Sequence, residues 1–110
     1  MPEYVQVLTT VDSENAGMRL GRGIVDARLG ACVQIVGPIR SLYWWQGSVE
    51  DAQEWQLLVK TTAERVPTLQ DHIKANHSYV IPEIIVTPIT AGNPDYLNWI
   101  SEETGKADAS

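Results

Sequence analysis

Hydrophobic and polar residues alternate over two long stretches near the middle of the chain. Residues 31–45 and 49–62 are rich in Val, Ile, Leu, Tyr and Trp, and Gln46-Gly47 supplies the positive φ that a short hairpin loop needs. This pattern predicts one long β-hairpin, bent or bulged in its first arm at Gly37-Pro38. Arms of about 12 residues, or about 40 Å, exceed the usual strand of about 17–20 Å. Because the arms overrun any sheet that so short a chain builds, we expect a second chain to cover them.

Shorter patterns on both sides of the hairpin predict the remaining elements. We expect strands over residues 4–10 and 84–88 and helices over about 13–29, 61–76 and 93–102. Ser13 is the expected N-cap of the first helix, and Thr61 with Glu64 forms a candidate capping box for the second. The order predicts an α+β, ferredoxin-like βαββαβ domain with a terminal helix over residues 1–104, followed by a short disordered tail at 105–110.

Strand alternation also predicts which side chains face the two central helices. The residues expected to face them are Val5, Val7, Val33, Ile35, Trp55, Leu57 and Val59. The opposite face then carries Tyr4, Gln6, Leu8, Cys32, Gln34, Gln56, Leu58 and Lys60. A face that is too apolar for water and too polar for a core indicates a contact between subunits.

Composition narrows the classes of partner. The net charge is −6, with 8 Lys and Arg against 14 Asp and Glu, and the basic residues form no cluster. Nucleic acid and anionic membrane surfaces are therefore poor candidate partners. A single cysteine, Cys32, excludes an intrachain disulfide, and no apolar run is long enough to span a membrane. With no signal-peptide pattern at the start, we expect a cytoplasmic protein.

Five motifs together resemble the CutA family of divalent-cation tolerance proteins. They lie at residues 29–33 (LGACV), 41–47 (SLYWWQG), 60–62 (KTT), 77–84 (HSYVIPEI) and 92–97 (GNPDYL). The resemblance implies a homotrimer of ferredoxin-like subunits, with a PII-like architecture in which the long hairpins pair between subunits. It also implies a non-enzymatic role in the tolerance of copper and other divalent cations.

The resemblance places a metal site at Cys32, His77 and Glu83, whose thiol, imidazole and carboxylate suit Cu²⁺ or Zn²⁺. His77 and Glu83 are about 20 Å apart if extended, so either the chain folds back or subunits share the site. Ser78 and Val80 replace the Pro and the acidic or polar residue of the family pattern, which implies weak binding, on the order of micromolar. The alternatives are an inert interface cysteine and a histidine that contacts the last carbonyls of a helix.

A second candidate site is an intersubunit cleft formed by Lys60, Tyr79 and Trp44. Such a cleft would bind a small anionic ligand, as in a PII-like sensor, or the trimer would serve as an assembly scaffold. The alternatives are a solvent-exposed lysine at a strand end and aromatic packing of Trp44 in the interface. No Ser or Thr stands in a pattern with His and a carboxylate that would make it a nucleophile, so the sequence does not predict an enzyme.

Overall fold

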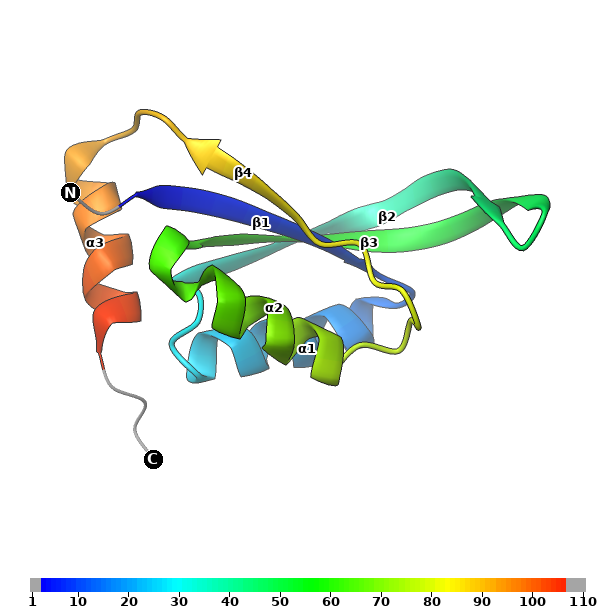
Figure 1. Ribbon diagram of the computed structural model, residues 1–110, viewed down its shortest axis with the longest axis horizontal. Helices are drawn as coiled ribbons and strands as arrows, with labels where there is room; N and C mark the ends of the chain where they lie inside the picture. The colour runs from blue at the N-terminus through cyan, green and yellow to red at the C-terminus, as the bar shows by residue number, and fades with distance from the viewer. Residues whose placement is uncertain (1–2, 107–110) are drawn as a thin grey trace.

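The computed structural model describes residues 3–106, which form a four-stranded antiparallel sheet in the order β2-β3-β1-β4. Helices α1 and α2 lie together on one face of this sheet (Figure 1). The elements are β1 (Tyr4–Val11), α1 (Glu14–Asp26), β2 (Cys32–Trp45), β3 (Ser48–Thr62), the 3-10 helix η1 (Ala63–Arg65), α2 (Val66–Ala75), β4 (Ile85–Ile89) and α3 (Pro94–Gly105). Their order and the strand order confirm the predicted ferredoxin-like α+β fold with a terminal helix. No helix among these residues has the length and apolar character needed to cross a membrane.

The core lies between the sheet and the two helices. Its buried apolar side chains come from the predicted strand face and from both helices: Val5, Val7, Leu57 and Val59 on strands, and Leu20, Ile24, Leu69 and Ile73 on α1 and α2. Helix α1 approaches the sheet closely at Gly21, where an added Cβ would lie 3.2 Å from the Val33 side chain. The sheet face opposite α1 and α2 is called the open face below.

Helix α1 begins where the sequence predicts, but it ends earlier than predicted. The Ser13 hydroxyl accepts a hydrogen bond from the Ala16 N–H at 3.0 Å, which confirms the predicted N-cap. The helix ends at Asp26, about three residues earlier than expected, because the chain turns at Arg28 with a φ of 62°.

The predicted capping box at Thr61 and Glu64 is wrong. The Thr61 hydroxyl is buried and donates to the Leu29 carbonyl at 2.8 Å, so it ties the end of β3 to the loop after α1. The chain passes through η1 before α2 begins, and Pro67 occupies the first turn of α2. The Thr61 side chain, which the local pattern assigned to a helix cap, therefore forms a tertiary hydrogen bond instead.

Helix α3 packs at the end of the sheet that lies away from the hairpin tip (Figure 1). Ser101 and the Tyr4 hydroxyl are hydrogen-bonded at 2.7 Å, and Glu103 forms an ion pair with Arg28 at 2.7 Å. Because Tyr4 lies on the open face, α3 covers part of a face over which the sequence predicted no helix. The helix includes Gly105, which the sequence placed in a tail, and residues 107–110 lie outside the described part of the chain.

A bulge in β2 changes the direction of every side chain beyond it. Val36 pairs with Gln56 and Ile39 with Glu54, so Gly37-Pro38, joined by a cis peptide bond, lies opposite Trp55 alone. The insertion of one residue moves the following side chains to the other face of the strand. The residues of the outer hairpin that share the open face with Glu54 are therefore Ile39, Ser41, Tyr43 and Trp45.

The hairpin tip extends beyond the helices (Figure 1). Several of its apolar side chains are exposed in the single chain. Its turn has positive φ at both Gln46 (50°) and Gly47 (83°), as the sequence predicted. Leu42 is 70% and Trp44 is 75% exposed, and both lie on the hairpin face opposite Tyr43. Large apolar residues gathered on one projecting arm are typical of a protein interface.

The fit of Trp55 against the bulge predicts that Gly37→Ala destabilises the protein. A Cβ at Gly37 would lie 2.5 Å from Trp55 Cδ1 and 3.1 Å from the Glu54 carbonyl oxygen, so the ring or the bulge must shift. We expect the free energy of unfolding to fall by about 1–3 kcal/mol, measured by denaturant unfolding. The control is Gly105→Ala, where nothing lies within 4 Å of the added Cβ. Equal stability of the two variants would contradict the packing argument.

Candidate functional site

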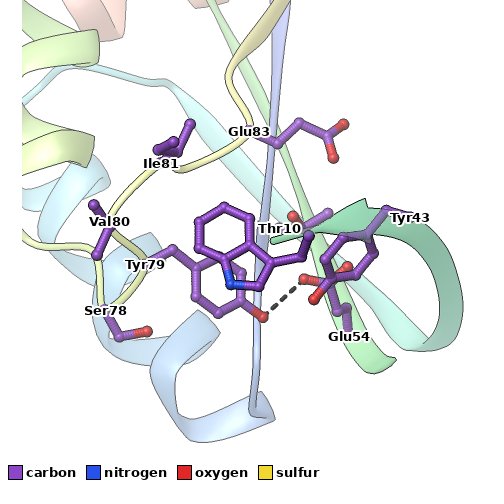
Figure 2. Close-up of a pocket in the computed structure, with 9 residues that line it drawn as sticks. Thr10, Tyr43, Glu54, Ser78, Tyr79, Val80, Ile81 and Glu83 are labelled. Carbon is purple, nitrogen blue, oxygen red and sulfur yellow. Dashed lines mark hydrogen bonds between the residues drawn. The ribbon is translucent and has the colours of Figure 1, made fainter. Parts of the chain in front are cut away.

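A cavity of about 520 Å³ opens on the open face beside the base of the hairpin. Three segments enclose it: the end of β1, the outer parts of β2 and β3, and the loop that joins α2 to β4 (Figure 2). Its lining residues are Thr10, Tyr43, Trp45, Glu54, Ser78, Tyr79, Val80, Ile81 and Glu83. This volume lies within the range of roughly 300–1,000 Å³ that is usual for small-molecule sites. We call it the open-face cavity.

A hydrogen bond between Tyr79 and Glu54 crosses the floor of the open-face cavity (Figure 2). The Tyr79 hydroxyl donates to Glu54 Oε2 at 2.8 Å, and Glu54 is only 5% exposed. Burial, followed by the hydrogen bond to Glu54 and its negative charge, raises the pKa of Tyr79 well above its usual value. The tyrosine is therefore a neutral donor that fixes one oxygen of a buried carboxylate.

His77 holds the loop that carries Tyr79. Its Nε2 lies 2.8 Å from the Thr10 carbonyl oxygen, and its Nδ1 accepts the Tyr79 N–H at 3.1 Å. Because Nδ1 accepts, the ring is neutral with its hydrogen on Nε2, which donates to Thr10. The Tyr79 ring lies against the imidazole, with centroids 5.0 Å apart. In this conformation both nitrogens of His77 are engaged by main-chain groups, and neither has a lone pair free for a metal.

The other two residues of the predicted metal site lie in different places. Glu83 is exposed and lines the open-face cavity. Cys32 lies at the start of β2, where it pairs with Lys60. It neighbours Tyr96 on α3, whose pKa is raised by burial first and then by Cys32. Within residues 3–106, no three His, Cys, Asp or Glu side chains converge in a way that could hold a metal ion. The single chain thus does not bring Cys32, His77 and Glu83 together.

The single chain also separates the three residues of the predicted cleft. Lys60 lies beside Cys32 and donates from Nζ to the side-chain carbonyls of Gln6 at 2.6 Å and Gln34 at 3.0 Å. Trp44 lies on the other face of the hairpin. Only Tyr79, of the three, lines the open-face cavity.

The residues that join Tyr79 instead are Tyr43, Trp45 and Glu54, which sequence reasoning missed. A signal for them exists in the chain. Once Gly37-Pro38 is counted as a bulge, the alternation shifts by one residue, and Tyr43 and Trp45 replace Trp44 on the open face. The lining then contains two carboxylates, Glu54 and Glu83, and no Lys or Arg, so its charge is opposite to that of the predicted cleft.

Comparisons with known proteins agree with this fold and with the motifs. The family model of the CutA1 divalent ion tolerance protein matches residues 5–103. The divalent-cation tolerance protein CutA of Thermus thermophilus is 48% identical over 99 residues, which cover 90% of this chain and 96% of that protein. Two solved structures are also similar in backbone and sequence.

The crystal structure of CutA1 from Oryza sativa has a TM-score of 0.90 at 40% identity, covering 98% of this chain and 96% of that one. The periplasmic divalent cation tolerance protein CutA from Archaeoglobus fulgidus has a TM-score of 0.89 at 36% identity, covering 92% and 98%. Because the family model spans almost the entire described chain and the relatives match in sequence as well as in backbone, this chain belongs to the CutA1 divalent ion tolerance protein family.

Proposed function

We propose that the protein acts in divalent-cation tolerance as a cytoplasmic, non-enzymatic homotrimer that binds Cu²⁺ or Zn²⁺ weakly. Membership of the family supports the link to divalent ions. The acidic net charge of −6 supports a cation, rather than nucleic acid or an anionic membrane, as the partner. The observation that carries the trimer is the hairpin, which projects from the sheet with its apolar side chains uncovered.

The sheet has two different edges that a neighbouring subunit can pair with. One edge is β2, including the projecting part of the hairpin, and the other is β4. A contact between unlike edges is heterologous, so it gives a closed ring where the rotation between subunits closes, rather than a twofold dimer. A ring of three, with each hairpin against the next subunit, covers the exposed edges and buries Leu42 and Trp44. This is the PII-like arrangement that the sequence motifs imply.

The metal role, in this proposal, belongs to the assembled trimer. Across the sheet, Cys32 pairs with Lys60, and Lys60 pairs with Gln6 on β1. His77 contacts Thr10, which lies four residues further along β1 than Gln6. Cys32 and the segment from His77 to Glu83 therefore meet only if different subunits supply them. Binding through His77 Nδ1 also displaces the Tyr79 N–H, which is a further reason to expect weak affinity.

A second candidate function is that of a small-ligand sensor or an assembly scaffold. The open-face cavity favours it, because three aromatic rings and a buried carboxylate converge there in one chain. A pocket with apolar walls and a few placed polar groups is typical of small-molecule sites.

The first test is the oligomeric state. Light scattering at micromolar concentration should give three times the chain mass of 12.2 kDa, because the projecting hairpin requires partners. A stable folded monomer would contradict the interface and the pairing of strand edges together.

Trp44→Ala should weaken the trimer, because a large aromatic at the centre of an interface commonly contributes about 2 kcal/mol or more. We expect the variant to dissociate on dilution in analytical ultracentrifugation while the parent remains assembled. Trp99→Ala is the matched control, since Trp99 lies on α3 at the other end of the sheet and stacks on Tyr96. If both variants dissociate at the same concentration as the parent, Trp44 has no part in assembly.

Metal binding is tested by calorimetric titration with Cu²⁺ and Zn²⁺ at pH 7.5 and 5.5. Affinity should be on the order of micromolar at pH 7.5 and should fall at pH 5.5, because a protonated imidazole has no lone pair for the metal. Cys32→Ser, His77→Ala and Glu83→Gln should each weaken binding, whereas Glu64→Gln, an exposed control, should not. The trimer should stay folded after chelation, unlike a domain built on structural zinc. If the affinity for the metal changes neither with pH nor with any of the three substitutions, the metal does not bind at Cys32, His77 and Glu83.

A further inference from the structure

We propose that the open-face cavity binds a small primary organic ammonium ion with an apolar body, an inference that rests on the ligand-binding role given above as the second candidate. The first support is Glu54. Its Oε2 accepts from Tyr79 at 2.8 Å, and no Lys, Arg or His among residues 3–106 forms an ion pair with either carboxylate oxygen. A carboxylate that is 5% exposed and has no cation beside it is unfavourable, and a positive charge from outside the chain would stabilise it.

The surroundings of Glu54 add negative charge. Glu83 is on the lining, and the negative charge of Asp12 also acts on Tyr79. The lining contains no Lys, Arg or His. Fields from several carboxylates combine in a partly enclosed, low-dielectric site, so a cation is favoured there and an anion is repelled.

The aromatic walls distinguish an organic cation from a metal ion. Tyr43 and Trp45 come from the hairpin, and Tyr79 faces Glu54 from the loop on the other side (Figure 2). Ring faces attract ammonium groups electrostatically. Divalent metal ions instead require several oxygen, nitrogen or sulfur ligands at short distance, and no such group of side chains is present in the described chain.

The remaining lining residues fit the rest of such a ligand. Val80 and Ile81 offer apolar surface next to the polar floor. The free lone pairs of Glu54 Oε1 suit an N–H donor, because Oε2 is already fixed by Tyr79. A primary ammonium group therefore binds at the Glu54 end, and its hydrocarbon part lies against the aromatic and aliphatic walls.

The experiment compares two probes of almost equal shape, cyclohexylammonium and cyclohexanol, by calorimetry on the full chain at pH 7.5. We expect the ammonium to bind at least about tenfold more tightly than the alcohol, because only the ammonium meets the charge of Glu54 and the ring faces. Glu54→Gln, which keeps the side-chain shape, should weaken ammonium binding about tenfold and leave that of the alcohol unchanged. Trp45→Leu should weaken the ammonium also, and the exposed control Glu64→Gln should match the parent.

Two results would overturn the inference: equal affinity for the two probes, and an affinity for the ammonium that Glu54→Gln does not change. Absence of ammonium binding in an intact trimer would also overturn it, since a cationic side chain of a second copy would then be the occupant. Light scattering on the same samples shows which proposal has failed. An intact, metal-binding trimer that does not bind ammonium refutes this inference alone. Ammonium binding to a monomer refutes only the trimer.

Discussion

The extra residue at Gly37-Pro38 determines the direction of every side chain in the outer half of β2. Because side chains alternate with a period of two, one inserted residue exchanges the two faces of the hairpin beyond it. Tyr43 and Trp45 therefore line the open-face cavity with Glu54 and the loop from α2, and Leu42 and Trp44 are exposed on the other face. A single irregularity in strand pairing thus separates the aromatic side chains of the cavity from the exposed apolar side chains of the hairpin.

The sequence predicted the fold well, because its signals were local and repeated. Alternating strands, the Gln46-Gly47 turn and the Ser13 cap each involve neighbours along the chain, and each was confirmed. The same reasoning failed at Thr61, where a distant carbonyl competes with the helix for the hydroxyl group. The bulge at Gly37-Pro38 was recognised in the sequence but not carried through to the alternation beyond it, so Tyr43 and Trp45 were not placed in the cavity with Tyr79; the intersubunit cleft of Lys60, Tyr79 and Trp44 stays a prediction.

His77 shows why a motif does not by itself identify a ligand. In this chain its two nitrogens bind Thr10 and Tyr79, so its visible role is to fold the loop over the end of β1. Such a role would preserve a histidine whether or not a metal is ever bound. The surroundings of the imidazole, rather than the identity of the residue, decide whether it is available to a metal.

Tyr79 is held at both ends, by His77 through its main-chain N–H and by Glu54 through its hydroxyl. A metal that takes the Nδ1 lone pair releases the first of these bonds and loosens the wall of the open-face cavity. A ligand that needs that wall in place then binds less well, and by reciprocity it weakens the metal. The two ligands would therefore be antagonists, and the loop that carries Tyr79 would report the concentration of one as a change in affinity for the other.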